Sequence, residues 1–193
     1  MRKSKYAWMK RHGLRQLIRL ATEHASTEVG QAALAYAVDE LLVVEVEHRM
    51  ITAQQNVGFA STSPTAHAGE GSAPTAERSS SVEMAADRLE RTNPWRPLSL
   101  ELLAGLNERN QRAAVISAFL VPAAGKGQRS LQMLPTHEAT EPENLRRIYQ
   151  VLGWPPNGEL LFHNADALRN AAYAAKRKMR EALLDKLVAA AIA

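Results

Sequence analysis

The sequence predicts a mainly α-helical protein, and two observations carry this prediction. Aromatic residues make up only 5% of the chain while alanine is abundant, a balance that favours helices over strands. Apolar residues also recur at spacings of three and four residues over several stretches, as they do along one face of an α-helix. With 193 residues, the chain is long enough for one domain, or for a small domain with extensions.

The first half of the chain predicts a short helix followed by a very long one. Residues 4–22 have helical apolar spacing, with Gly13 as a point at which this helix can split in two. Ser26 or Thr27 is a good N-cap for a second helix from Glu28 to about Gln55. The middle of this second helix, AALAYAVDELLVVEVE, is apolar around nearly its whole circumference. It is therefore expected to be buried on all sides.

Two acidic residues interrupt this apolar middle. A charge near a buried helix usually has a partner, so we expect Asp39 and Glu40 to pair with Arg15, Arg19 or Arg88. The alternative, a position on a narrow solvated edge of the helix, stays open. Glu45 and Glu47 are two residues apart, face different ways and predict no carboxylate pair.

A change of composition after Asn56 predicts a flexible loop. Residues 57–79 are rich in Ser, Thr, Ala, Gly and Pro, and we expect this insertion to be disordered because it has little to bury. A short helix follows at residues 82–91, with Ser80 or Ser81 as its cap, and Pro94 prevents its continuation.

This order of short helix, long central helix, loop and short helix resembles the histone fold. Three segments carry the resemblance: LRQLIRLATEH, TEVGQAALAYAVDELLVVEVEHRMITAQQ and RSSSVEMAADRLER. With LERTNPW after the last of them, the chain looks most like the histone-fold subunits of the general transcription factor TFIID and related coactivators. The second loop departs from the family, because it is over twenty residues long here instead of a few.

The resemblance implies a histone-fold domain at residues 1–95 and a mostly helical extension at residues 96–193, with room for a small β element. It implies a handshake heterodimer, in which the central helix of a second histone-fold protein covers the far side of this one. The interface residues expected from it are Leu34, Val38, Leu41, Leu42, Leu17 and Leu89. It also implies a non-enzymatic subunit that scaffolds a nuclear transcription or chromatin complex together with further subunits.

The second half of the chain predicts three further helices. They cover residues 97–110, residues 142–152, and a last stretch from Asn164 or Asp166 to near Ala193. Ser99 is a candidate cap for the first of them, and Gly153 ends the second. The apolar run at 113–122 is too short to distinguish helix from strand. The segment LQML at 131–134 is a candidate strand.

Basic residues gather at both ends of the chain, which has a net charge of +4. The first 22 residues contain no acid, and KRKMR lies in the last predicted helix. Such segments can contact nucleic-acid phosphates, although ordinary solvated helix faces look the same in a sequence. The candidate nucleic-acid contacts are Lys3, Lys5, Lys10, Arg11, Lys176 and Arg177.

No motif in the sequence points to catalysis, a metal or a cofactor. The chain contains no cysteine, which excludes thiolate zinc sites, disulfides and thiol catalysis. The GKG at 125–127 lacks the first glycine of a phosphate-binding loop, and the six histidines show no ligand spacing. Trp8, Trp95 and Trp154 are more typical of packing anchors than of stacking platforms. No apolar run is long enough to span a membrane.

Two other functions stay open beside the nuclear subunit. The basic N-terminus suits a targeting segment or an RNA contact, as in a structural subunit of a mitochondrial ribosome or respiratory complex. Alternatively, the N-terminal helices read DNA in a small helical DNA-binding regulator. Localisation in the nucleus or in the mitochondrion would separate the first two functions.

Overall fold

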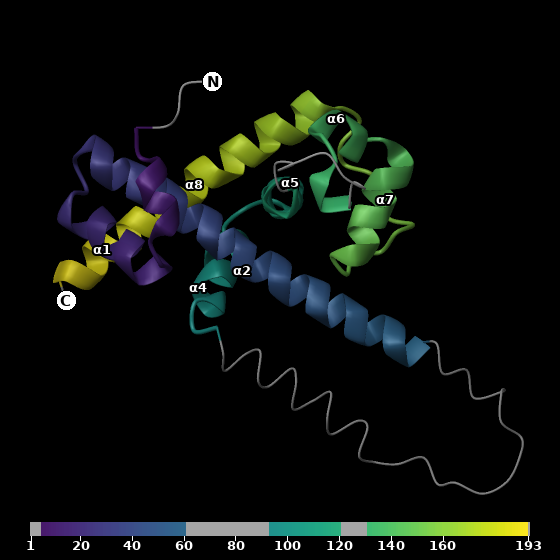
Figure 1. The fold of residues 1–193 in the computed structure, drawn as a ribbon, viewed down its shortest axis with the longest axis horizontal. Coiled ribbons are helices and arrows are strands. Elements are labelled where there is room, and N and C mark those ends of the chain that lie inside the picture. The colour runs from purple at the N-terminus through teal and green to yellow at the C-terminus, as the bar shows by residue number, and fades with distance from the viewer. Residues whose placement is uncertain (1–4, 61–92, 121–130, 193) are drawn as a thin grey trace, which may run out of the picture.

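The computed structural model describes residues 5–60, 93–120 and 131–192, and its regular elements are all helices (Figure 1). The α-helices are α1 (Leu14–Glu23), α2 (Glu28–Ala60), α4 (Arg96–Ala104), α5 (Glu108–Phe119), α6 (Thr136–Ala139), α7 (Pro142–Val151) and α8 (Ala165–Ile192). Two 3₁₀ helices complete the set, η1 (Ala7–Arg11) and η2 (Leu131–Met133). The prediction of a mainly helical protein is confirmed for these residues.

The first two helices follow the predicted pattern, with one difference in length. Gly13 separates η1 from α1, and the hydroxyl of Thr27 caps α2 by accepting from the backbone N–H of Gly30 at 3.3 Å. Helix α2 continues past Gln55 to Ala60. Residues 56–60 contain no proline, and their single glycine costs a helix only about 1 kcal/mol. Its last residues occupy the start of the segment predicted to be a loop. The remainder of that loop and the predicted helix at 82–91 lie outside the described residues.

The predicted helix at 97–110 is two helices in the structure. Asn107 stands between α4 and α5 with an extended backbone (φ −69°, ψ 159°), and its side chain accepts from the N–H of Asn110 at 2.9 Å. This cap starts α5, which takes in most of the apolar run of uncertain type. The prediction of a strand at 131–134 was wrong, since the first three of these residues form η2. A strand needs a neighbour to pair with, and the described part of the chain supplies none.

The ends of the last two long helices are as predicted. After α7, Gly153 has a left-handed backbone (φ 71°) and donates to the carbonyl of Gln150, while Trp154 donates to the carbonyl of Tyr149 at 2.8 Å. These two bonds form a Schellman motif, which requires a residue that tolerates positive φ. Helix α8 begins after Asn164, whose side chain accepts from the N–H of Ala167 at 2.7 Å.

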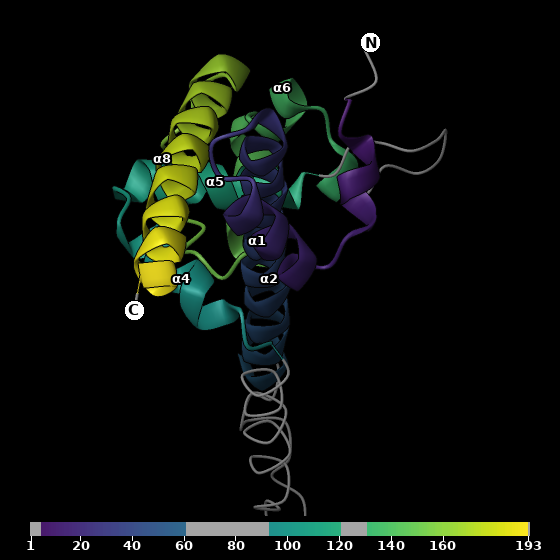
Figure 2. The ribbon, with the colours of Figure 1, turned by 90° about the vertical axis from the view of Figure 1, so that its left-hand side faces the viewer.

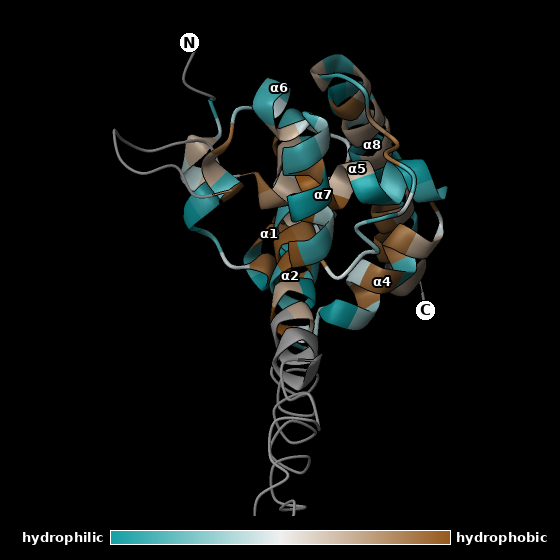
Figure 3. Ribbon diagram, turned by 90° about the vertical axis from the view of Figure 1, so that its right-hand side faces the viewer, coloured by the Kyte–Doolittle hydropathy of each residue, from teal (hydrophilic) through white to brown (hydrophobic). Residues whose placement is uncertain are grey.

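Helix α2 lies at the centre of the molecule. Helix α8 crosses it and packs against it, α1 packs on another side of it, and α4 and α5 lie between α2 and α8 (Figures 1 and 2). In Figure 3, hydrophobic residues lie along α2 and on part of α4, while α6 is largely hydrophilic. A single hydrophobic core draws residues from both sides of residue 95, so the two predicted parts of the chain share one core.

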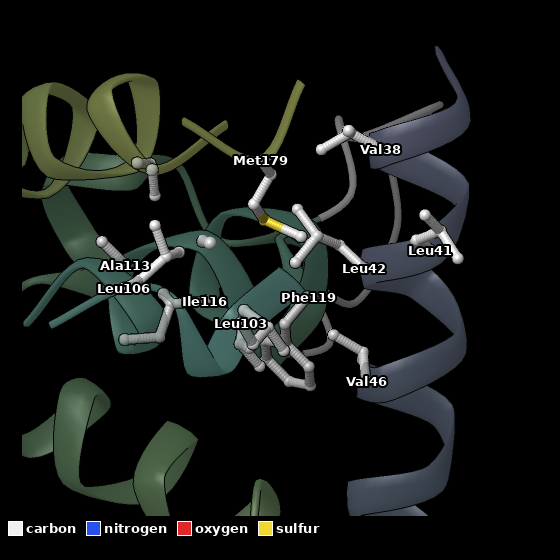
Figure 4. Packing of buried hydrophobic residues seen from close by; sticks show 14 of the residues in the cluster. Val38, Leu41, Leu42, Val46, Leu103, Leu106, Ala113, Ile116, Phe119 and Met179 are labelled. Atoms are coloured by element: carbon white, nitrogen blue, oxygen red, sulfur yellow. The ribbon is translucent and has the colours of Figure 1, made fainter. Parts of the chain in front are cut away.

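Most of the apolar circumference of α2 is covered by helices of the same chain, but the predicted burial on all sides was wrong, since Val43 is 37% exposed beside the exposed Asp39, Glu40 and Glu47. In Figure 4, Leu42 and Val46 of α2 point toward Met179 of α8 and Phe119 of α5. Leu34, Val38, Leu41 and Leu42, four of the expected interface residues, are at most 1% exposed, as is Leu17 of α1. These residues are buried within the single chain, and a handshake partner stays a prediction. Leu89 lies outside the described residues.

None of the described helices combines the length and the hydropathy that crossing a bilayer requires.

Candidate functional site

A pocket of about 470 Å³ opens between α2, α4, α5 and the turn that follows α7. Leu100, Leu103 and Val115 give it an apolar wall. The other wall is formed by two guanidinium groups, an indole ring and a carboxylate, which belong to Arg49, Arg112, Trp154 and Glu108. We call this set of four residues the arginine–tryptophan site.

A buried carboxylate positions the first of these arginines. Glu45 lies one turn before Arg49 on α2, is 1% exposed, and places Oε1 2.7 Å from Arg49 Nε. Its Oε2 lies 3.9 Å from Nε of Arg96 on α4. The Arg49 N–H is not directed at the carboxylate, so this contact is an ion pair without a well-aligned hydrogen bond. A charge removed from water needs such partners, and both arginines are therefore held against Glu45.

Two guanidinium groups meet on the ring of Trp154. The Cζ atom of Arg49 lies 5.1 Å from the ring centroid, and that of Arg112 lies 5.5 Å from it. Arg112 also lies 5.1 Å from the ring centroid of Tyr149, against which Trp154 packs edge-on. Trp154 is therefore a packing anchor, as the sequence indicated, and also a platform for two cations. The left-handed Gly153 places it there, because the Schellman motif fixes the direction of the chain at that point.

The arginines around the pocket are paired with carboxylates that differ in exposure. Glu45 faces Arg49 and Arg96, and Glu108 faces Arg112. The side chain of Arg112 is 15% exposed, whereas that of its ion-pair partner Glu108 is 68% exposed. The cations are thus sheltered, while one of the two acids is largely in solvent. Such an arrangement can hold a negatively charged group.

Sequence reasoning missed this site, although two local signals point to it. The spacing EVEHR at 45–49 and ERNQR at 108–112 places a glutamate one helical turn before an arginine on two different helices. Nothing in either segment indicates that they meet, nor that Trp154 joins them. Sequence analysis treated Glu45 only as a residue without a carboxylate partner.

Three of the candidate nucleic-acid contacts form ion pairs with acids of the same chain. Lys5 pairs with Glu28 at 3.4 Å, Lys176 with Asp39 at 2.9 Å, and Arg177 with Glu181 at 3.7 Å. Lys10 and Arg11 are exposed on η1, and Lys3 lies outside the described residues. These ion pairs reduce the positive field that a phosphate backbone would meet.

The acids in the middle of α2 are placed differently from the prediction. Asp39 pairs with Lys176 of α8 and not with Arg15 or Arg19 of α1, and Arg19 pairs instead with Glu23. The third expected partner, Arg88, lies outside the described residues. Glu40 is exposed, and its pKa is raised by partial burial and then by repulsion from Asp39 and Glu47. The structure therefore supports the solvated edge for Glu40 and an α2–α8 ion pair for Asp39.

Within residues 5–60, 93–120 and 131–192, no group of three or more His, Asp or Glu side chains is arranged to hold an ion.

Comparison of the chain with protein-family models, with curated proteins and with solved structures gave no match. The histone-fold resemblance therefore rests on the sequence segments alone. Function has to be argued from the site and the surface themselves, since a fold by itself does not specify one.

Proposed function

We propose that this protein is a non-enzymatic helical subunit that folds around its own core and works by binding. The observation that carries the proposal is the burial of α2 within one chain, where Val38, Leu41 and Leu42 are fully buried. A chain whose core is buried by its own helices needs no partner to fold, so partners and ligands would bind to the surface of the already folded chain. The pocket supports binding over catalysis, because its ionisable groups are two arginines, which do not exchange protons near neutral pH, and Glu108.

Two exposed aromatic residues are the best candidates for contact with further subunits. Trp8 of η1 is 46% exposed and Tyr173 of α8 is 68% exposed. Tryptophan and tyrosine are enriched among the residues that contribute most to protein interfaces. Aspartate or alanine at these positions would leave the core intact while removing such contacts.

Sedimentation of the purified full chain tests the proposal. We expect a folded, helical monomer at micromolar concentration. A chain that is unfolded or aggregated alone, and that becomes soluble only with a partner, would show that the core is not self-sufficient. Co-purification of the tagged chain, with wild type compared with Tyr173→Ala and Trp8→Ala, would then identify the partners that use this surface.

A second candidate is the histone-fold subunit of a nuclear transcription or chromatin complex. It is supported by the N-terminal arrangement, in which the ten-residue α1 packs on the long α2. Because the middle of α2 is already covered, a second histone-fold protein would have to displace α4, α5 or α8, or to bind beyond the described core. Structural subunits of mitochondrial assemblies and small DNA-binding regulators share the helical, basic character of this chain.

Localisation and partner identity decide between these alternatives. A tagged chain in the nucleus, together with a histone-fold protein, would support the transcription or chromatin subunit. A tagged chain in the mitochondrion, together with ribosomal or respiratory subunits, would support the organellar one. Capture of neither class would leave the self-folding binding subunit as the better description.

A further inference from the structure

We propose that the pocket at the arginine–tryptophan site binds a small organic anion. Its carboxylate or phosphate head would lie between Arg49 and Arg112, and its apolar body would lie against Leu100 and Leu103. This goes beyond the proposed function, because it assigns a ligand class to the pocket and does not depend on the oligomeric state.

The first support is the chemistry of the two arginines. Ion pairs engage Nε of Arg49 and Nη2 of Arg112, and a guanidinium group carries further N–H donors in a planar fork. That fork matches the oxygens of a carboxylate or a phosphate.

The second support is preorganisation. Arg49 and Arg112 both stack on Trp154, and Arg49 is also held by Glu45. Side chains that are already fixed lose little conformational entropy when a ligand arrives. Both cations are therefore held beside Trp154 in the pocket lining before anything is bound.

The third support is the shape and polarity of the pocket. Its volume of about 470 Å³ lies within the range of about 300–1,000 Å³ typical of small-molecule sites. An inorganic ion would leave most of this space unfilled. Leu100, which is 38% exposed, and the buried Leu103 offer an apolar wall that suits a hydrocarbon or aromatic body.

The two glutamates have different consequences for a ligand. Glu45 is buried beneath Arg49, so its charge stays in place when the pocket fills. Glu108 is largely in solvent and touches only Arg112 among the pocket cations, so it can turn outward. The anion would replace Glu108 as the partner of Arg112, and Glu108→Gln should then strengthen binding.

Calorimetric titration of the full chain with benzoate and with phenyl phosphate tests the proposal, with inorganic phosphate and neutral benzyl alcohol for comparison. We expect saturable binding of at least one organic anion, about ten-fold or more tighter than either comparison compound. The two anions distinguish a carboxylate site from a phosphate site. Absence of saturable binding for both would overturn the proposal, and equal binding of benzyl alcohol would overturn the role of charge.

Matched variants assign the binding to this pocket. Arg112→Gln should weaken it about ten-fold or more, whereas Arg147→Gln should not change it. Arg147 is the control because it forms the same kind of one-turn ion pair, with Glu143 of α7, and does not line the pocket. Unchanged binding in a folded Arg112→Gln variant would overturn the proposal.

A second pair of variants keeps the test valid if Arg112→Gln destabilises the fold. Leu100 is partly exposed at the pocket wall, so charges are tolerated there. Both Leu100→Glu and Leu100→Lys remove the apolar contact, but Leu100→Glu should weaken anion binding about ten-fold or more relative to Leu100→Lys. Equal loss in both variants would contradict an electrostatic site. Sedimentation tests the proposed function and titration tests the anion site. A chain that is oligomeric but binds benzoate would therefore overturn only the proposal of a self-folding subunit.

Discussion

Ser99 of α4 donates a hydrogen bond from its buried hydroxyl to the backbone carbonyl of Leu41 in α2, at 2.8 Å. The sequence suggested that Ser99 caps a helix, but its hydroxyl instead forms a hydrogen bond to a neighbouring helix. The small side chain lets α4 approach α2 closely, and the bond satisfies a polar group that has no access to water. This contact joins the two halves of the chain at the centre of the core.

Enlarging Ser99 should therefore be more harmful than removing its hydroxyl. We expect Ser99→Leu to lower the free energy of unfolding by about 1–3 kcal/mol, because it forces α4 away from α2. Ser99→Ala should cost about 1 kcal/mol or less, since the carbonyl of Leu41 keeps its place within α2. Urea denaturation of both variants measures the difference. A larger loss for Ser99→Ala would show that the hydrogen bond matters more than the close approach.

Glu45 should be the acid whose loss costs most. Glu45→Gln leaves Arg49 and Arg96 without their shared carboxylate, and we expect a loss of about 2–3 kcal/mol. This is below the range for fully buried pairs, because the two arginines keep partial access to solvent. Glu47→Gln, two residues away and exposed, is the control and should change stability by less than about 0.5 kcal/mol. Equal effects in urea denaturation would mean that the ion pairs of Glu45 with the two arginines do not stabilise the fold.

Much of the fold can be predicted from the sequence where the causes are local. Thr27, Asn164 and Gly153 act through hydrogen bonds within a few residues, and each was placed at or next to a helix end. The apolar middle of α2 also predicted burial, but not that a face with Val43 stays exposed, nor which segments cover the rest. Met179 and Phe119 come from distant segments, and the periodicity of a helix says nothing about its neighbours.

Of the candidate site, too, only the local contacts could be predicted from the sequence. The pairs Glu45–Arg49 and Glu108–Arg112 are one helical turn apart and are visible in the sequence. Their meeting at Trp154 depends on how α2, α5 and the turn after α7 pack together. That packing is a property of the whole core, so no local pattern indicates it.

The unfolding of this protein should not depend on its concentration. A handshake dimer is stabilised by mass action, so its melting temperature rises with protein concentration. Because Leu41 is buried within the single chain, we expect the same melting temperature over about a hundredfold range of concentration. Leu41→Ala should lower stability by about 2–5 kcal/mol at every concentration. A midpoint that rises with concentration would indicate that a second chain contributes to the core.

Glu40 should make stability depend on pH in an unusual direction. Its pKa is raised in the folded protein, first by partial burial and then by Asp39 and Glu47. The folded state therefore holds this proton more tightly than the unfolded state, so the stability contributed by Glu40 falls as pH rises through its pKa. Glu40→Gln should raise the melting temperature slightly near neutral pH and have no effect near about pH 3.

The exposed Glu159 provides the control for this effect. Glu159→Gln should leave the melting temperature unchanged at both pH values. Destabilisation by Glu40→Gln near neutral pH would contradict the sign of the shift. It would mean that the charged form of Glu40 has a favourable partner in the folded chain.

Gly30 should be the glycine that tolerates substitution least. It lies in the first turn of α2, where a Cβ atom would come 2.0 Å from the carbonyl oxygen of His24. That carbonyl cannot easily turn away, because it accepts from both the N–H and the hydroxyl of Thr27, each at 2.9 Å. Any shift that makes room would disturb the cap of α2 and the corner at which α1 turns into it. We therefore expect Gly30→Ala to cost more than about 2 kcal/mol.

Gly105, at the end of α4, is the matched comparison. A Cβ atom there would meet only the carbonyl oxygen of Leu102, at an ordinary distance of 3.6 Å, and its backbone is right-handed helical (φ −72°, ψ −2°). Gly105→Ala should therefore be neutral or stabilise the protein by about 0.4–1 kcal/mol, because alanine restricts the unfolded chain. Thermal and urea unfolding of the two variants side by side measure the contrast. Equal tolerance at both positions would mean that the corner between α1 and α2 opens easily, and that α1 is only loosely held on the central helix.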